Sequence, residues 1–173
     1  MNGQMDWSDW DRKSLEEKGF VGWIRWADWP PPKAELPASA GGVYVLFRGS
    51  QSEPRFLDRS TGATHKKRDP SVGREALIAN WVPAANVVYI GKADHHRLLR
   101  RLDEYRAMGA RPTGSHWGGR LIWQLDDSSE LLVAYLVLPP NEVPRNVEKE
   151  MIEGFRRRYG QPPFANDPHR LGR

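Results

Sequence analysis

The chain has 173 residues, 39% of them hydrophobic and 28% charged, which is enough for one compact domain with a substantial core. It contains no cysteine, which excludes disulfides and thiolate metal sites. It also has no apolar run of about 18 residues, which argues against a membrane span. Because the N-terminus is acidic and does not resemble a signal peptide, we expect a cytoplasmic protein that does not associate with membranes.

The formal net charge is +4, and its distribution along the chain is uneven. Residues 48–120 hold fourteen Lys and Arg against seven Asp and Glu, an excess of +7, whereas the parts before and after carry −2 and −1. A basic segment of this kind favours a polyanionic partner through counterion release. A solvated basic surface fits the charge pattern equally well.

Residues 1–40 are predicted to be an N-terminal extension, and residues 41–173 the main domain. The extension holds five of the eight tryptophans and ends at the prolines of 30–32. A helical turn or two is expected near residues 14–18, and residues 20–26 are a candidate strand packed on the main domain. Aromatic side chains beside a basic surface can stack bases, but we favour packing.

The first clear strand is expected at residues 42–47. With a period of two, Val43, Val45 and Phe47 face one side of the sheet, and Tyr44 and Leu46 face the other.

Residues 48–86 follow as an insertion too long for a tight hairpin. It is polar and turn-rich at first, and it contains a basic run at residues 65–68 and a short helix around residues 71–80. Connections of this length are usually functional or mobile. Contact with nucleic acid and disorder both remain open.

A second strand is expected at residues 87–90, ended by Gly91. Asp94 can then cap a helix that runs to about Met108. The apolar face of this helix contains leucines at 98, 99 and 102 and a tyrosine at 105.

Three arginines on this helix point in different directions. Arg101 lies at the margin of the apolar face, Arg100 points to the opposite side, and Arg97 lies on a flank. Helical geometry therefore selects Arg101 as the arginine that can face inward.

Two further strands are predicted at residues 121–125 and 131–138, because both stretches are almost continuously apolar. A last helix is expected from Asn146, as a cap, to Tyr159, with Gly160 ending it. Glu148 falls inside the apolar arc of that helix, spaced with residues 152, 155 and 159. A carboxylate there is costly unless it is paired or binds a metal ion, and we favour the metal ion over a buried salt bridge.

Five short motifs occur in order along residues 41–167. They are Gly42-Val43-Tyr44, Val88-Tyr89-Ile90-Gly91-Lys92, Arg101-Leu102 with Tyr105, Glu148-x-x-Met151-Ile152 and Pro163-Phe164-Ala165-Asn166. Together they resemble the GIY-YIG nuclease superfamily, a module of excision-repair incision subunits and of some homing and restriction endonucleases. The resemblance implies an α+β fold, in which a small mixed or antiparallel sheet is flanked by helices. The insertion after the first strand is far longer than that family's usual connection.

The resemblance also implies a divalent-metal-dependent endonuclease that hydrolyses DNA phosphodiester bonds. The implied metal is Mg²⁺, with Mn²⁺ as an alternative, bound by Glu148. The implied catalytic residues are Tyr44, Tyr89, Lys92, Arg101, Glu148 and Asn166. By spacing alone, Arg100 remains a rival to Arg101.

Other residues are candidates for contact with the nucleic acid, with double-stranded DNA favoured over single-stranded DNA. They are Lys66, Lys67, Arg68, Arg97, Arg100, Tyr105, His116 and Arg120. Sequence specificity is left to the insertion, the N-terminal segment, a partner protein or a homodimer. The alternative function is a catalytically inactive nucleic-acid-binding module of the same fold.

Overall fold

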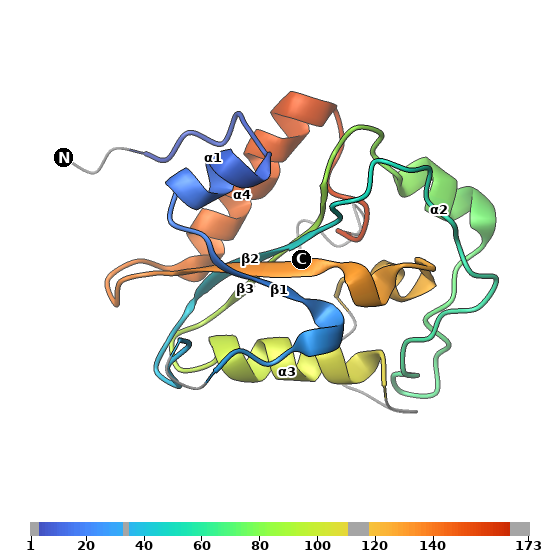
Figure 1. Cartoon of the computed structure of the whole chain (residues 1–173), viewed down its shortest axis with the longest axis horizontal. Coiled ribbons are helices and arrows are strands. Elements are labelled where there is room, and N and C mark those ends of the chain that lie inside the picture. The colour runs from blue at the N-terminus through green and yellow to red at the C-terminus, as the bar shows by residue number, and fades with distance from the viewer. Residues whose placement is uncertain (1–3, 33–34, 111–117, 167–173) are drawn as a thin grey trace.

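The computed structural model describes residues 4–32, 35–110 and 118–166. These residues form an α+β fold in which a four-stranded antiparallel sheet, in the order β1-β4-β2-β3, is flanked by helices (Figure 1). The elements in chain order are α1 (Arg12–Glu17), β1 (Val21–Arg25), η1 (Trp26–Asp28), β2 (Gly42–Phe47), α2 (Arg74–Asn80), β3 (Val87–Ala93), α3 (Leu98–Met108), η2 (Arg120–Gln124), η3 (Ser128–Glu130), β4 (Leu132–Val137) and α4 (Pro144–Tyr159), where η marks a 3-10 helix.

β2 is one of the two inner strands, and its six residues are all buried between β3 and β4. Val43 and Val45 contribute to the core on the α4 side of the sheet, whereas Tyr44 and Leu46 contribute to the core on the α3 side. The predicted alternation along this strand is confirmed. It places Tyr44 between the sheet and α3.

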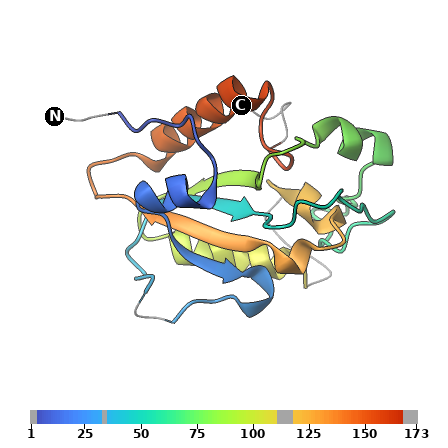
Figure 2. The same ribbon diagram turned by 45° about the horizontal axis from the view of Figure 1, so that its top comes forward.

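The two long helices cover opposite faces of the sheet (Figures 1 and 2). α4 packs with α1 on one face and buries Met151 and Phe155, and α3 packs on the other face and buries Leu98 and Leu102. None of the helices in the described parts of the chain has the length and apolar character needed to cross a bilayer.

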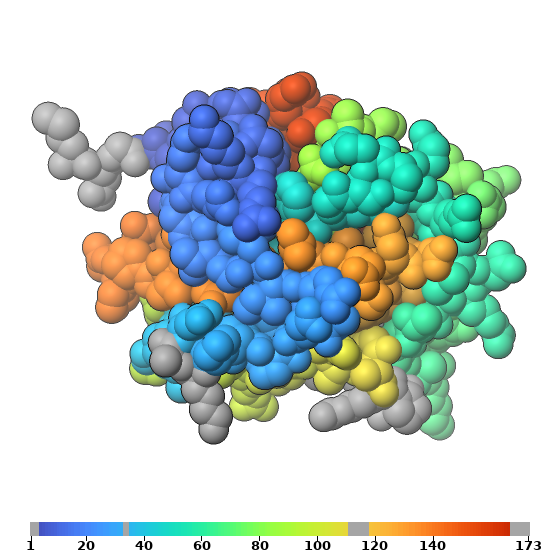
Figure 3. Space-filling view, in the orientation of Figure 1, coloured from blue at the N-terminus to red at the C-terminus, as the bar shows by residue number. Residues whose placement is uncertain are grey.

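The N-terminal segment is part of the same sheet. β1 pairs antiparallel with β4, which confirms the strand expected within residues 20–26. Trp7 and Trp10 are buried on the α4 side, with Trp10 edge-on to Phe155 at 5.3 Å between ring centroids, and Trp26 is buried on the α3 side. The preference for packing over base stacking holds for these side chains, and Figure 3 shows the segment lying against the body of the protein.

The strand predicted at residues 121–125 is wrong, because η2 occupies residues 120–124. β4 already has β1 and β2 as neighbours, and a short apolar run alone does not distinguish a strand from a buried helical turn. η2 starts after Gly119, whose φ of 74° lies in the left-handed region, and buries Leu121, Ile122 and Trp123.

The predicted start of the last helix is also wrong. α4 begins two residues before Asn146, at Pro144, and Val143 occupies the N-cap position. Proline is well suited to the first turn, where a backbone N–H has no helical partner. The predicted end is confirmed, since Gly160 adopts a φ of 82° and its N–H donates to the Arg156 carbonyl.

Gln124 ties the insertion to the rest of the fold. Its side chain is buried, accepts a hydrogen bond from the Val72 N–H at 2.8 Å, and donates to the carbonyls of Leu57 and Val72 at 3.1 and 3.0 Å. The Thr61 N–H donates to the Trp123 carbonyl at 3.0 Å. The insertion is therefore an ordered part of the fold rather than the disordered alternative, and its predicted helix is α2.

Candidate active site

Tyr44 and Tyr89 lie on the neighbouring strands β2 and β3, with their ring centroids 6.0 Å apart. Tyr44 is paired across the sheet with Gly91, and a Cβ at Gly91 would overlap the Tyr44 ring. Gly91 therefore makes room for the tyrosine. The prediction that Gly91 ends the strand is wrong, because β3 continues to Ala93.

Both phenols are neutral at physiological pH, as tyrosines ordinarily are, and burial makes their ionisation still less favourable. The Tyr44 side chain is fully buried, and its hydroxyl interacts with that of Tyr89. Burial raises the pKa of Tyr44 well above its usual value. Burial and then the Glu148 charge raise the pKa of Tyr89 to about 12, while Arg101 opposes the shift.

Glu148 faces this cluster from the first half of α4, and its side chain is partly buried. Burial raises the pKa of its carboxyl group, and the positive charges of Lys92, Arg101 and Arg145 oppose the increase. The Glu148 charge in turn acts on the phenols of both strands. The carboxylate thus lies at the meeting point of side chains from β2, β3, α3 and α4. Arg145, one of its neighbours, was missed in the sequence.

The structure separates the two rival arginines. Arg101 is partly buried, and its charge acts on Glu148 and on Tyr44 and Tyr89. Arg100 is 72% exposed and its Nε donates to the Glu104 carboxylate at 3.0 Å. The direction of the helix therefore brings Arg101 to the cluster and turns Arg100 away, as helical geometry predicted.

Lys92 and Arg101 border a hollow of about 270 Å³, whose lining residues are Lys92, Ala93, Asp94, Arg97 and Arg101. The Lys92 ammonium donates to the Asp94 carboxylate at 3.0 Å, and this hydrogen bond lowers the pKa of Asp94. Three of the lining side chains are cationic, so the hollow suits a phosphate group.

Asp94 is not the helix cap that we predicted. α3 begins at Leu98, because the preceding loop is held by the segment before β2. The His96 N–H donates to the Ser39 carbonyl at 3.0 Å, and the Leu98 N–H donates to the Ala40 carbonyl at 3.1 Å. Asp94 is thereby left to pair with Lys92 at the hollow, a role that helix-capping rules do not suggest.

Asn166 supports the strand that carries Tyr89. Its buried amide accepts from the Ile90 N–H at 2.9 Å and donates to the Ile90 carbonyl at 2.8 Å. The Ala165 N–H also donates to the Val88 carbonyl at 2.8 Å. β3 is an edge strand, so these bonds satisfy backbone groups that no neighbouring strand can reach. Asn166 thus acts through the backbone of β3.

Tyr105 cannot contact nucleic acid as predicted, because its side chain is fully buried. Its hydroxyl donates to the Gly119 carbonyl at 2.7 Å, and its ring packs 5.3 Å from that of Tyr89. Its ring thus packs against both tyrosines of the pair and helps to fix their positions.

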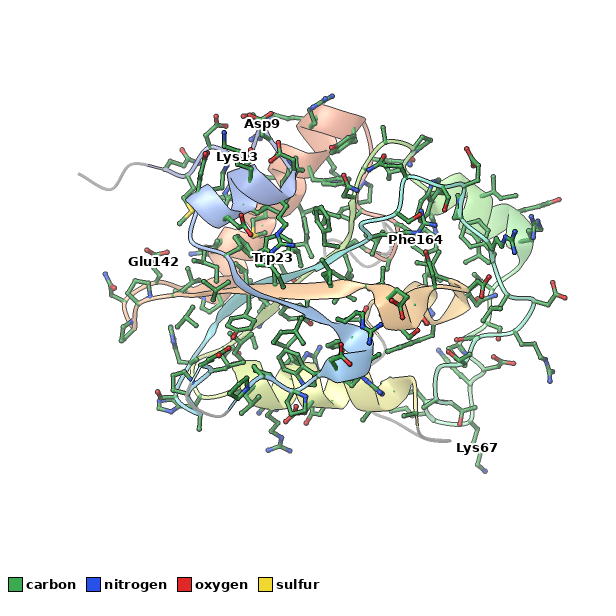
Figure 4. The ribbon with its side chains drawn as sticks, in the orientation of Figure 1. Asp9, Lys13, Trp23, Lys67, Glu142 and Phe164 are labelled. Atoms are coloured by element: carbon green, nitrogen blue, oxygen red, sulfur yellow. The ribbon has the colours of Figure 1, made fainter. Side chains whose placement is uncertain are left out.

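The other predicted contact residues are dispersed. Arg97 is exposed at the hollow, Arg120 is partly buried at the start of η2, and His116 lies outside the described residues. The basic residues 66–68 lie in the insertion, where Lys67 points away from the body of the protein (Figure 4), and none of them lines the hollow.

Comparison with known proteins finds no protein family, no curated protein and no solved structure that matches the chain.

Proposed function

We propose that the protein is a divalent-metal-dependent endonuclease that hydrolyses DNA phosphodiester bonds in the manner of the GIY-YIG nucleases it resembles. One observation carries the proposal. Tyr44, Tyr89, Arg101 and Glu148 come from four different elements, and the charges of Arg101 and Glu148 act on both phenols and Arg101 acts on Glu148. Such a combination of a desolvated acid, cations and shifted pKa values is typical of catalytic sites.

Glu148 suits a hard divalent cation. Its partial burial favours the neutral acid, and a cation bound to the carboxylate would reverse that preference. The described residues contain no group of three or more histidine and acidic side chains that could enclose a metal ion. A single carboxylate fits Mg²⁺, which keeps several water ligands and binds phosphate oxygens directly. Bound there, the ion would neutralise charge on the phosphate and on the departing 3′-oxygen.

The cations of the site would bind the scissile phosphate. Arg101 can hold two phosphate oxygens with its planar donor groups, and Lys92 supplies a mobile point charge beside it. To make this contact, the Lys92 ammonium would give up its hydrogen bond to Asp94 and donate to the phosphate instead. Arg97, at the rim of the hollow, would contact the adjacent phosphate.

Tyr44 is proposed to orient the attacking water and, once its own phenol proton has passed to solvent, to accept a proton from that water as a phenolate. As the water oxygen bonds to phosphorus, the bond from phosphorus to the 3′-oxygen breaks, and the water proton must leave. Arg101 already opposes the increase in the pKa of Tyr44, so additional positive charge at the site favours ionisation.

The test is the conversion of supercoiled plasmid to nicked or linear DNA in Mg²⁺ or Mn²⁺, with a chelator as the blank. We expect Glu148→Gln and Arg101→Ala to abolish cleavage while the protein stays folded. Matched controls lie on the same helices. Glu153→Gln on the polar side of α4 and Arg100→Ala on the exposed side of α3 should cleave like the parent.

Three results contradict the proposal. They are cleavage that persists in both site variants, cleavage lost equally in the controls, and a parent protein that binds DNA but does not cut it with either metal. The last result identifies the protein as a binding module of this fold.

A further inference from the structure

The insertion carries a tight basic turn with unusual backbone geometry. His65 and Arg68 exchange two backbone hydrogen bonds, of 3.1 and 2.9 Å, around Lys66 and Lys67. Lys66 has a φ of 50° and Lys67 a φ of 64°, so both central residues are left-handed, as in a type I′ turn. Such turns favour Asn-Gly, because a residue with a bulky side chain is disfavoured in the left-handed region. Two lysines at these positions break a local structural rule, which is expected chiefly where function requires the side chains.

The positive charge of this turn is not neutralised within the protein. Lys66, Lys67 and Arg68 are all exposed, and none of them forms an ion pair with a described carboxylate. The nearest acid in the sequence, Asp69, instead interacts with Ser71: hydrogen bonds from the Ser71 hydroxyl and, at 2.8 Å, from the Ser71 N–H lower the pKa of Asp69. The turn therefore presents three free cations at the surface.

The turn has a fixed position relative to the candidate active site. The Ala63 N–H donates to the Met108 carbonyl at 2.6 Å, which joins the insertion to the C-terminal end of α3. Arg101 lies seven residues earlier on α3, about 10 Å along the helix axis. Figure 4 shows Lys67 beyond the end of α3, pointing away from the body of the protein, and Glu142, just before α4, at the opposite end.

We propose that the Lys66–Lys67 turn is a second contact for the phosphate backbone and makes duplex DNA the preferred substrate. This inference rests on the proposed function. Allowing for the chain between Ala63 and the turn, the two contacts lie about 10–20 Å apart, or about three to six base pairs at 3.4 Å per pair. A stiff duplex bridges two fixed points without being ordered first, whereas a flexible single strand must lose conformational freedom to do so. Gln124, which anchors the insertion, keeps the spacing constant.

The turn itself offers a sharp test, the double variant Lys66→Asn/Lys67→Gly. This variant removes two positive charges and introduces Asn-Gly, the pair most common at these positions of a type I′ turn. Its Tm should therefore equal or exceed that of the parent. Binding is measured without metal on a duplex of about 30 base pairs, roughly three helical turns, and on a single strand of equal length. The charge control is Lys13→Ala, on α1, whose side chain is 86% exposed.

We expect the double variant to bind the duplex more weakly. We also expect the slope of log affinity against log salt to become shallower by about 2, or about 1 for each lysine that no longer binds a phosphate. The single strand should lose less affinity, and Lys13→Ala should bind as the parent does. Unchanged duplex affinity and salt slope in the double variant overturn the inference. An equal loss on both substrates overturns the selection of duplex DNA.

Failure of this inference can be told from failure of the proposed function. If the parent cuts plasmid but the double variant binds the duplex unchanged, only the second contact is wrong. If the parent never cuts but duplex binding still depends on the turn, the nuclease assignment is wrong and the contact stands.

Discussion

The Asn166 side-chain amide makes two hydrogen bonds with the backbone of Ile90. We predict that this one amide holds β3, the strand that carries Tyr89, in its position. Asn166→Ala removes the acceptor for the Ile90 N–H and the donor for the Ile90 carbonyl. Ile90 is fully buried, so water does not readily replace either bond. The substitution should therefore destabilise the fold and loosen β3 locally.

The magnitude follows from the two backbone groups that lose their partner. Each unsatisfied buried group costs about 1–3 kcal/mol, so we expect a loss of about 2–4 kcal/mol after local relaxation. For a protein of this size, 1 kcal/mol lowers Tm by about 2–4 °C, which gives a fall of about 4–16 °C. Asn141→Ala, in an exposed turn, is the matched control and should change stability by less than about 0.5 kcal/mol.

Thermal denaturation measures the global effect, and amide hydrogen exchange at Ile90 measures the local one. The exchange of the Ile90 amide should accelerate more than that of β1, which lies at the opposite edge of the sheet. The proposed DNA cleavage should slow as well, because Tyr89 and Gly91 flank the freed residue. A Tm and an Ile90 exchange rate equal to those of Asn141→Ala would show that the amide does not hold the strand.

Three further substitutions test the electrostatics and the insertion. Glu148→Gln should raise the Tm of the metal-free protein at neutral pH. Burial raises the pKa of the Glu148 carboxyl in the folded protein, so its charged form destabilises the fold. The difference in Tm between variant and parent should therefore vanish as the pH falls below the ordinary pKa of 4.5. An equal increase in Tm at low pH contradicts this. Because the pKa of Tyr89 is raised from 10.0 to about 12, the parent should lose stability as pH rises through that window, and urea midpoints of Tyr89→Phe should fall less steeply there. Gln124→Ala should cost about 2–4 kcal/mol, since it removes three hydrogen bonds to the insertion. Limited proteolysis should then cut within residues 48–86 first, and uniform resistance there would refute the anchoring role.

Features set by local periodicity were predictable from the sequence. The alternation of β2 placed Tyr44 correctly, and the face of α3 distinguished Arg101 from Arg100. In both cases, each side chain is directed by the geometry of its own element, which residues close in sequence determine.

Features set by distant partners were not predictable. Asp94 is a good cap by composition, yet Ser39 and Ala40 bind the loop after β3 and delay the helix. Gly91 looked like a terminator, and only the pairing of β2 with β3 reveals that it makes room for Tyr44. An apolar stretch became η2 rather than a strand because both sides of β4 were already occupied.

The covering of one edge of the sheet bears on how the protein is made. β1 is the edge strand on one side, and on the other side Ala165 and Asn166 cover the outer edge of β3. Asn166 follows Ile90 by 76 residues, so a ribosome must complete nearly the whole described chain before the β3 edge is covered. An unfinished polypeptide therefore lacks the support for Tyr89, and the nuclease activity proposed above would arise only once synthesis is almost complete.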